Sequence, residues 1–374
     1  MLALALMPNT RRTIRYLRSW LGGAGTLREE TLQLEREDRA VPAKLLRPVS
    51  QRAPAAARHR GWIVLHGVTR PGIEHPQLVR FARALASTGA SVLIPEVPEW
   101  KELRLAPGAT LPTLQAAVRT LAEHPEIADA PYGLVGFSFG GPQALVAASH
   151  ESVADAVAGV VAFGGYCDLE RTLRFQFTGE HEWRGRVERI APDPYGRWVV
   201  GANYLTEARG YEDADDVARA LWSLAAGAGD HGAPASSPVY DELKAKLRAR
   251  LAPAHRALFD LFAPPTPREP DPREAEAVVS ALASAGRRID PLMEPTPFLG
   301  RLRHPVELLH GRGDSLIPYT ESQRLMAHFP EHVRARLTVT RLFAHARGER
   351  FPVARGAWEA WTFFRALGRV LGTA

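Results

Sequence analysis

The hydrophobic residues of this chain fall into short continuous runs separated by stretches of helical spacing. Continuous apolar runs are typical of strands buried on both faces of a sheet, and here they occupy residues 62–65, 91–95 and 157–163. Between them, apolar side chains recur every three or four positions in residues 76–87 and 111–121, the spacing of an amphipathic helix. The alternation of strand and helix predicts an α/β fold, a doubly wound and mostly parallel sheet with helices on both faces.

Two weaker patterns come before this alternation. Residues 31–35 alternate apolar and polar side chains and residues 43–46 form a short apolar piece, so we expect a strand pair at one edge of the sheet. Still earlier, an apolar stripe at helical spacing lies beside several arginines; it comprises Ile14, Leu17, Trp20 and Leu21. We expect a helix there that packs on its own domain or on a partner, with a membrane-surface helix as the alternative.

The rhythm of buried strands stops after residue 164 and resumes near residue 305. The intervening stretch has helical patterns at residues 198–205, 215–226, 239–262 and 274–285, separated by Pro- and Gly-rich loops. Afterwards come strands at 305–309 and 337–343 and helices at 320–329 and 357–371. We therefore predict an N-terminal helical segment (1–28), a core built from 29–164 and 299–374, and a helical cap segment (165–298) inserted late in the sheet.

Composition narrows the functional classes. The 374 residues are 45% hydrophobic and 24% charged, as in a globular protein. The net charge of +6 comes from arginines spread among acidic residues, without a basic run containing aromatic residues, which argues against nucleic acid binding. The single cysteine, Cys167, excludes an intrachain disulfide and a cysteine-based zinc site, and we expect it to be a small buried hydrophobe.

The N-terminus does not read as a secretory signal, because its apolar residues precede the arginines instead of following them. No stretch approaches the ~20 apolar residues of a membrane span. We therefore expect a cytoplasmic protein without stable membrane insertion, and a homodimer is compatible with the sequence.

The chemistry-bearing stretch is Gly136-Phe137-Ser138-Phe139-Gly140, which lies between a short apolar run and an Ala-rich helical pattern. This is the strand, tight turn and helix of a Gly-x-Ser-x-Gly nucleophile elbow. Gly136 and Gly140 let strand and helix nearly touch, while the turn lifts the Ser138 hydroxyl above the sheet. The next backbone N–H, that of Phe139, lies at a helix N-terminus, where it can stabilise an anion. Phe137 is expected to pack beneath the turn, and the Phe139 ring to wall a pocket.

Two later turns carry the partners that such a serine needs. Asp314 lies in a Gly-rich turn directly after the strand at 305–309, and His345 directly follows the last strand. Parallel strands place both turns at the same sheet edge. A serine hydroxyl becomes a good nucleophile when a base such as histidine removes its proton.

The order Ser138, Asp314, His345, together with the His66-Gly67 loop after a strand, resembles the α/β-hydrolase superfamily from about residue 62 to the C-terminus. The resemblance implies an esterase- or lipase-like serine hydrolase with Ser138 as nucleophile, His345 as general base and Asp314 as the carboxylate that orients it. It also places the oxyanion hole at the backbone N–H groups of Val68 and Phe139.

Other residues compete for these roles. Asp168 follows the strand at 157–163, where some hydrolases of this fold carry the acid, so it is the alternative to Asp314. His66 is expected to brace the oxyanion loop. His181-Glu182 lacks a second helical histidine and is expected to be solvated, not to bind metal. Aromatic residues of the cap segment can line an acyl pocket or pack in the core; they are Tyr166, Trp183, Trp198 and Trp222.

The resulting hypothesis is hydrolysis of a small-molecule carboxylic ester through an acyl-enzyme intermediate, with no metal and no organic cofactor. Serine at the elbow argues against dehalogenase and epoxide hydrolase chemistry, for which the superfamily uses aspartate. Amide or peptide hydrolysis is the main alternative, since the same triad serves both. A noncatalytic binding protein of this fold is a further alternative, against which the complete triad argues.

Overall fold

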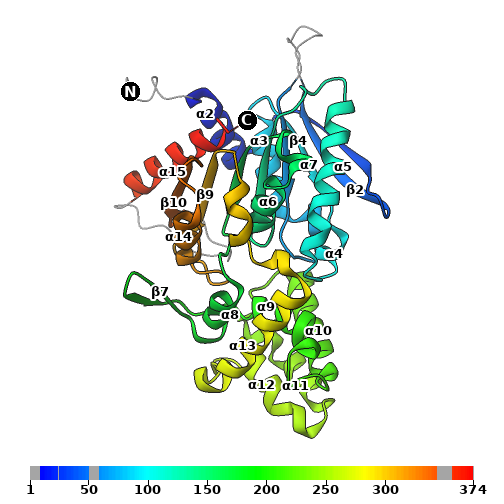
Figure 1. Ribbon diagram of the computed structural model, residues 1–374, viewed down its shortest axis with the longest axis vertical. Helices are drawn as coiled ribbons and strands as arrows, with labels where there is room; N and C mark the ends of the chain where they lie inside the picture. The colour runs from blue at the N-terminus through cyan, green and yellow to red at the C-terminus, as the bar shows by residue number, and fades with distance from the viewer. Residues whose placement is uncertain (1–8, 24, 50–58, 343–355, 374) are drawn as a thin grey trace.

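A computed structural model describes residues 9–23, 25–49, 59–342 and 356–373. Its centre is an eight-stranded sheet in the order β1-β2-β4-β3-β5-β6-β9-β10 (Figure 1). Strand β2 pairs antiparallel with β1 and β4, and every other neighbouring pair is parallel. The strands are β1 (Leu27–Glu35), β2 (Ala40–Pro48), β3 (Gly61–Leu65), β4 (Ser91–Pro95), β5 (Tyr132–Phe137), β6 (Val157–Phe163), β9 (Val306–Gly311) and β10 (Ala335–Thr340). The predicted mostly parallel α/β sheet is confirmed, and the strand pair expected at one edge is β1–β2, which is antiparallel.

Alternate residues of the central strands point into two hydrophobic layers, as the period of a strand requires. Ile63 and Leu65 of β3 pack on one side of the sheet, and Val64 packs on the other. The first layer is covered by α5 (Thr110–Glu123), α6 (Gly140–Ala148) and α14 (Tyr319–His328), and the second by α2 (Thr10–Gly22), α3 (Pro76–Ala86) and α15 (Gly356–Val370). The continuous apolar runs therefore form strands because both of their faces are covered.

The N-terminal helix α2 packs on its own domain. The Asn9 side chain donates to the Gly368 carbonyl at 3.1 Å, and Arg80 Nε of α3 donates to the Trp20 carbonyl at 2.8 Å. The buried residues of α2 include Tyr16, whereas Leu21 of the predicted apolar stripe is 79% exposed. The intrachain alternative is thus the one observed, with the buried face rotated from the predicted stripe.

The cap segment gathers at one end of the molecule, below the sheet in Figure 1. Its elements are α8 (Leu169–Thr178), β7 (Glu180–Trp183), β8 (Arg186–Arg189), α9 (Tyr195–Tyr204), α10 (Asp215–His231), α11 (Asp241–Ala249), α12 (Arg256–Phe262) and α13 (Pro272–Ile289). Short helices α4 (Pro98–Lys101) and α7 (Glu151–Ala154) belong to the core. The 3₁₀ helices are η1 (Gly72–Glu74), η2 (Pro107–Ala109), η3 (Leu205–Glu207), η4 (Pro238–Tyr240), η5 (Pro253–His255), η6 (Pro291–Met293) and η7 (Thr296–Arg301).

Several elements differ from the sequence-based expectations, and one of them is helix α8, because no helix was expected over 169–178. The cap segment contains the hairpin β7–β8, whose turn places Arg184 and Gly185 at positive φ; its strands are charged, so no apolar run announces them. The helix expected over 239–262 is split into α11 and α12, with Pro253 in the break. Strand β10 ends at Thr340 and not at 343.

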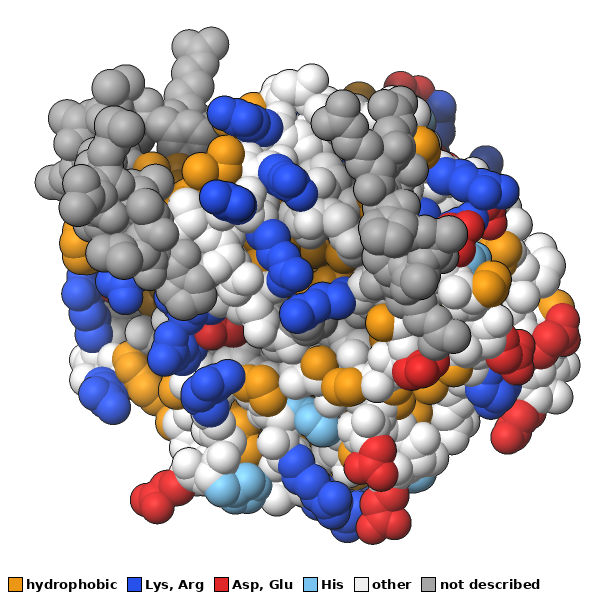
Figure 2. Space-filling model, turned by 90° about the horizontal axis from the view of Figure 1, so that it is seen from above, with side chains coloured by type: hydrophobic (Ala, Val, Ile, Leu, Met, Phe, Trp, Pro, Cys, Tyr) orange, Lys and Arg blue, Asp and Glu red, His pale blue; other side chains and the backbone are white. Residues whose placement is uncertain are grey.

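The surface fits the charge pattern of the sequence. On the face shown in Figure 2, Lys and Arg side chains stand between hydrophobic ones, and acidic side chains lie mainly toward the rim. Many arginines are paired with carboxylates, such as Arg83 with Glu29 and Arg174 with Glu276. In the part of the chain that the structure describes, no helix has the length and apolarity to cross a membrane.

Candidate active site

Ser138 occupies a sharp turn between β5 and α6, with a positive φ of 52°. A Cβ atom on Gly136 would lie 2.0 Å from the Gly140 carbonyl oxygen, and one on Gly140 would lie 2.5 Å from the His66 carbonyl oxygen. Only glycine fits such close approaches. The Ser138 N–H donates to the Phe163 carbonyl at 2.7 Å, which ties the turn to the end of β6. The elbow geometry expected from the sequence is present.

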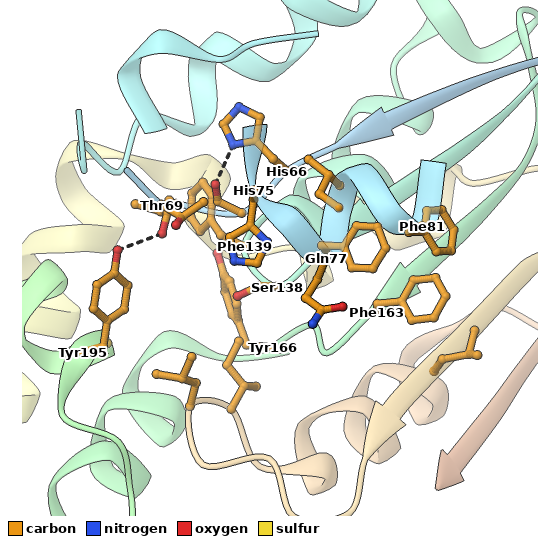
Figure 3. Close-up of a pocket in the computed structure, with 18 of the residues that line it drawn as sticks. His66, Thr69, His75, Gln77, Phe81, Ser138, Phe139, Phe163, Tyr166 and Tyr195 are labelled. Atoms are coloured by element: carbon orange, nitrogen blue, oxygen red, sulfur yellow. Dashed lines mark hydrogen bonds between the residues drawn. The ribbon is translucent and has the colours of Figure 1, made fainter. Parts of the chain in front are cut away.

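The loop after β3 lies against this serine. A Cβ atom on Gly67 would lie 3.3 Å from Ser138 Cβ, and Val68 lines the same cavity as Ser138. Phe139 directly precedes α6, so its N–H is one of the free donors of a helix N-terminus. From the cap segment, the Tyr195 hydroxyl donates to the Val68 carbonyl at 3.2 Å (Figure 3). Val68 and Phe139 therefore flank Ser138, while their role as oxyanion donors stays a prediction.

His66 braces this loop, as expected. Its Nδ1 lies 2.6 Å from the Gly67 carbonyl oxygen, and its Nε2 accepts the Val97 N–H at 3.0 Å. Burial lowers the pKa of His66 to about 4, so the ring is neutral near pH 7. Since both ring nitrogens are engaged in holding backbone, His66 is poorly suited to act as the general base.

Asp314 is fully buried in the turn after β9. Its Oδ1 accepts the N–H groups of Leu316 and Ile317 at 2.9 and 3.0 Å, and its Oδ2 lies 3.4 Å from His310 Nε2. Bonds to backbone N–H groups favour the ionised form of a carboxyl. The turn thus holds Asp314 in one orientation, as an orienting carboxylate requires.

The competing acid, Asp168, has a different task. It is the N-cap of α8, accepts the Arg171 N–H at 2.8 Å and pairs with Arg287 at 3.4 Å. These contacts give it a structural role at the junction of core and cap segment. His345 lies outside the described residues, so the completed triad stays a prediction.

Ser138 opens onto a cavity of about 520 Å³. The cavity is lined by residues from the sheet edge, the cap segment and helices α2, α3 and α15. Tyr166 lines it, as one reading of the sequence proposed, whereas Trp198 packs in the core at 0% exposure. In Figure 3, Ser138 lies between Tyr195 on one side and Phe81 and Phe163 on the other.

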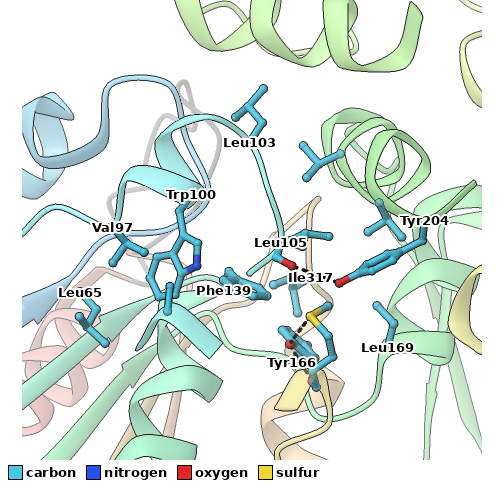
Figure 4. Packing of buried hydrophobic residues seen from close by; sticks show 14 of the residues in the cluster. Leu65, Val97, Trp100, Leu103, Leu105, Phe139, Tyr166, Leu169, Tyr204 and Ile317 are labelled. Carbon is cyan, nitrogen blue, oxygen red and sulfur yellow. Dashed lines mark hydrogen bonds between the residues drawn. The ribbon is translucent and has the colours of Figure 1, made fainter. Parts of the chain in front are cut away.

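The two phenylalanines beside the serine face opposite layers. Phe137 stacks on Phe163 at 4.8 Å and meets Phe81 edge-on at 4.9 Å, so it packs beneath the turn as expected. Phe139 meets Trp100 edge-on at 5.1 Å and lies near Tyr166, in the packing shown in Figure 4. The Phe139 ring is only 6% exposed and therefore belongs to the core as well as to the cavity wall.

Comparison with solved structures agrees with this architecture. The chain superposes on puromycin hydrolase with a TM-score of 0.52 at 15% identity, over 94% of this chain and 40% of that one. The chain has the α/β-hydrolase fold. Esterase Est1E from Butyrivibrio proteoclasticus is similar at 12% identity and a TM-score of 0.46, over 90% of this chain and 99% of that one. Pyrococcus horikoshii acylaminoacyl peptidase is similar at 11% identity and 0.49, over 91% and 40%. No family model and no curated protein sequence matches the chain.

The hydrolase fold here includes features that the sequence analysis missed. Tyr195 and three residues of α2 reach the cavity: Tyr16, Leu17 and Trp20. No local signal assigns them to a cavity, because contacts between distant segments leave no pattern in either one. The only hint was the apolar stripe of the N-terminal helix.

His181 is a correction to the expectation of a solvated pair. Its side chain is 6% exposed and packs edge-on against Phe175 and Tyr319, at 5.7 and 5.3 Å, and burial lowers its pKa. Its neighbour Glu182 stays half-exposed and pairs with Arg324. Within the described ranges, no group of three His, Cys, Asp or Glu side chains could hold a metal ion.

Cys167 is buried, as expected. Burial raises the pKa of its thiol to about 12. A thiol of this kind is protonated near pH 7 and is a poor nucleophile.

Proposed function

We propose that this chain is a serine hydrolase that cleaves a carboxylic ester through an acyl-enzyme intermediate. The observation that carries the proposal is Ser138, held at positive φ on the elbow and opening onto a large cavity beside a helix N-terminus. Residues with a strained backbone conformation persist where the surrounding structure holds them, and they cluster at active sites. Among the described residues that line the cavity, Ser138 is the only serine, and none is a cysteine.

In the proposed mechanism, Ser138 Oγ attacks the ester carbonyl carbon while its proton passes to His345. The negative charge on the carbonyl oxygen is stabilised by the Val68 and Phe139 N–H groups, each worth roughly 3 kcal/mol by precedent. The alcohol leaves with the proton from His345. His345 then removes a proton from water, whose oxygen attacks the acyl carbon. The bond to Ser138 Oγ breaks, His345 returns the proton to that oxygen, and the acid is released. Asp314 orients the imidazole and stabilises its protonated form.

The cavity lining favours an uncharged ester over a peptide. None of the described lining residues is Asp, Glu, Lys or Arg. A peptide terminus entering this cavity would lose its hydration without gaining an ion pair, which is costly. Amide cleavage by the same serine is therefore the second candidate.

The test is labelling with a fluorophosphonate, which reacts with activated serines. We expect the folded protein to be modified at Ser138 and the Ser138→Ala variant to stay unlabelled. The same variant should lose p-nitrophenyl ester hydrolysis by about 10⁵-fold or more. A folded protein whose Ser138 stays unmodified would refute the proposal. Faster cleavage of aminoacyl p-nitroanilides than of p-nitrophenyl esters would favour the amide alternative.

A further inference from the structure

The residues that line the cavity fall into two groups on either side of Ser138. One group comes from the cap segment and includes polar side chains, among them Thr172, Gln176 and Tyr195. The other comes from helices α2, α3 and α15 and from the strand ends beneath them; it contains one side-chain amide, that of Gln77, and is otherwise aliphatic or aromatic, with Leu17, Phe81, Phe163 and Leu367 among its members. We propose that this second group binds the acyl chain of the substrate, and that α2 sets the chain length accepted. The substrate class is then an ester of a long, uncharged aliphatic acid.

The second group is suited to a hydrocarbon chain. Apart from the amide of Gln77, its side chains are aliphatic or aromatic, and none of them is charged. Each methylene that enters is therefore worth about 0.8 kcal/mol without cost to a charged group. Phe81, Phe163 and Leu367 are also buried in the core layer between sheet and helices. The whole cavity, at about 520 Å³, is of the size that takes ligands of several hundred daltons.

The acyl part fits this group better than the alcohol does. In the proposed mechanism the acyl group stays on Ser138 through both half-reactions, whereas the alcohol leaves after the first and water must follow it. A binding region between core helices is suited to the acyl group, because that group remains bound through both half-reactions. The cap side carries Thr172, Gln176 and Tyr195 beside its apolar residues, and it is left for departure of the alcohol and arrival of water.

Helix α2 is a fixed wall of this region. Tyr16 meets Phe81 edge-on at 5.9 Å, and the Arg80 guanidinium lies 4.5 Å above the Trp20 ring. Together with the hydrogen bonds from Asn9 and Arg80, these contacts fasten α2 to α15 and α3. A larger side chain at a cavity-lining position of α2 therefore has to occupy cavity space.

The helix offers a matched pair of variants. Leu17 lines the cavity, whereas Leu21, one turn further along, is 79% exposed. Leu17→Trp and Leu21→Trp make the same change in one helix, at a position that lines the cavity and at an exposed position that does not. The substrates are p-nitrophenyl esters from acetate to palmitate, assayed with the full chain.

We expect the unaltered protein to prefer medium or long chains. Leu17→Trp should lower kcat/KM for the long esters by at least about tenfold while the value for acetate changes by no more than about twofold. Leu21→Trp should leave the whole profile unchanged. If Leu17→Trp fails to fold, Leu17→Ala serves instead and should raise the ratio of long-chain to short-chain activity.

This inference rests on the proposed function, and the two fail differently. Absence of fluorophosphonate labelling at Ser138 overturns the hydrolase itself. Labelling with an unchanged chain-length profile in the Leu17 variants, or a preference for acetate in the unaltered protein, overturns only the acyl site.

Discussion

At the scale of single residues, the nucleophile elbow is held from both layers of the core. A strained turn costs about 1–3 kcal/mol and persists only where its surroundings fix it. Phe137 packs against Phe81 and Phe163 in one layer, and Phe139 packs against Trp100 in the other. The two phenylalanines that flank Ser138 therefore fasten the turn to opposite faces of the sheet. The sequence showed both rings but not that Phe139 is a core residue.

Tyr195 yields the prediction at this scale. Its hydroxyl donates to the Val68 carbonyl, so it positions the peptide unit next to the proposed oxyanion donor. Tyr195→Phe removes one hydrogen bond worth about 1 kcal/mol and should lower kcat roughly fivefold with little change in KM. The measurement is steady-state kinetics with a p-nitrophenyl ester.

Tyr240→Phe is the matched control for this variant. The Tyr240 hydroxyl donates to the Ala233 carbonyl at 3.1 Å, within the cap segment, and Tyr240 is not among the described lining residues. The change should leave kcat unaltered. A rise in KM without a fall in kcat for Tyr195→Phe would mean that Tyr195 binds substrate instead of positioning the loop.

At the scale of elements, the two candidate acids, Asp168 and Asp314, differ in the backbone segment that each carboxylate holds. Asp168 begins α8, and Asp314 closes the turn after β9. Asparagine is also a good N-cap, so Asp168→Asn should keep α8 and leave kcat within about threefold. Asp314→Asn should lower kcat by about 10⁴-fold, because an amide stabilises the wrong histidine tautomer. Ester hydrolysis and the midpoint of thermal unfolding, measured on both variants, check this. A larger activity loss for Asp168→Asn would reassign the acid.

Comparing the expected and observed elements shows which of them local sequence patterns can predict. Strands β4 and β6 match the expected ranges because strands buried on both faces are continuous apolar runs. The hairpin β7–β8 was not predicted, because its short strands are charged and half-exposed. The break between α11 and α12 was not predicted, because the helical spacing of apolar residues continues across Pro253. Local patterns thus predict the strands that are buried on both faces, whereas they miss the charged hairpin and helix α8.

At the scale of the whole molecule, the sequence predicted the fold, the candidate nucleophile and two cavity-lining aromatic residues, Phe139 and Tyr166, but not the part of the wall that α2 contributes. The elbow could be predicted because its demands are local, namely two glycines around one serine. The cavity depends on α2 meeting α3 and α15, which are far apart along the chain. His345, placed by pattern alone, lies outside the described residues, so the catalytic base rests on sequence order.

Because several parts of the chain line the cavity, a ligand that fills it should stabilise the folded state against thermal unfolding. The core, the cap segment and α2 each contribute residues to the cavity lining, so a long-chain alkyl phosphonate attached to Ser138 would contact all three. Each buried methylene contributes about 0.8 kcal/mol to the folded state. A decyl phosphonate should therefore raise the thermal unfolding midpoint by about 5 °C or more beyond a methyl phosphonate. Calorimetry on the two adducts measures this, and Ser138→Ala treated with either reagent should show no shift. Equal midpoints for both adducts would mean that the chain stays in solvent, because a chain held between α2 and the core must add apolar burial.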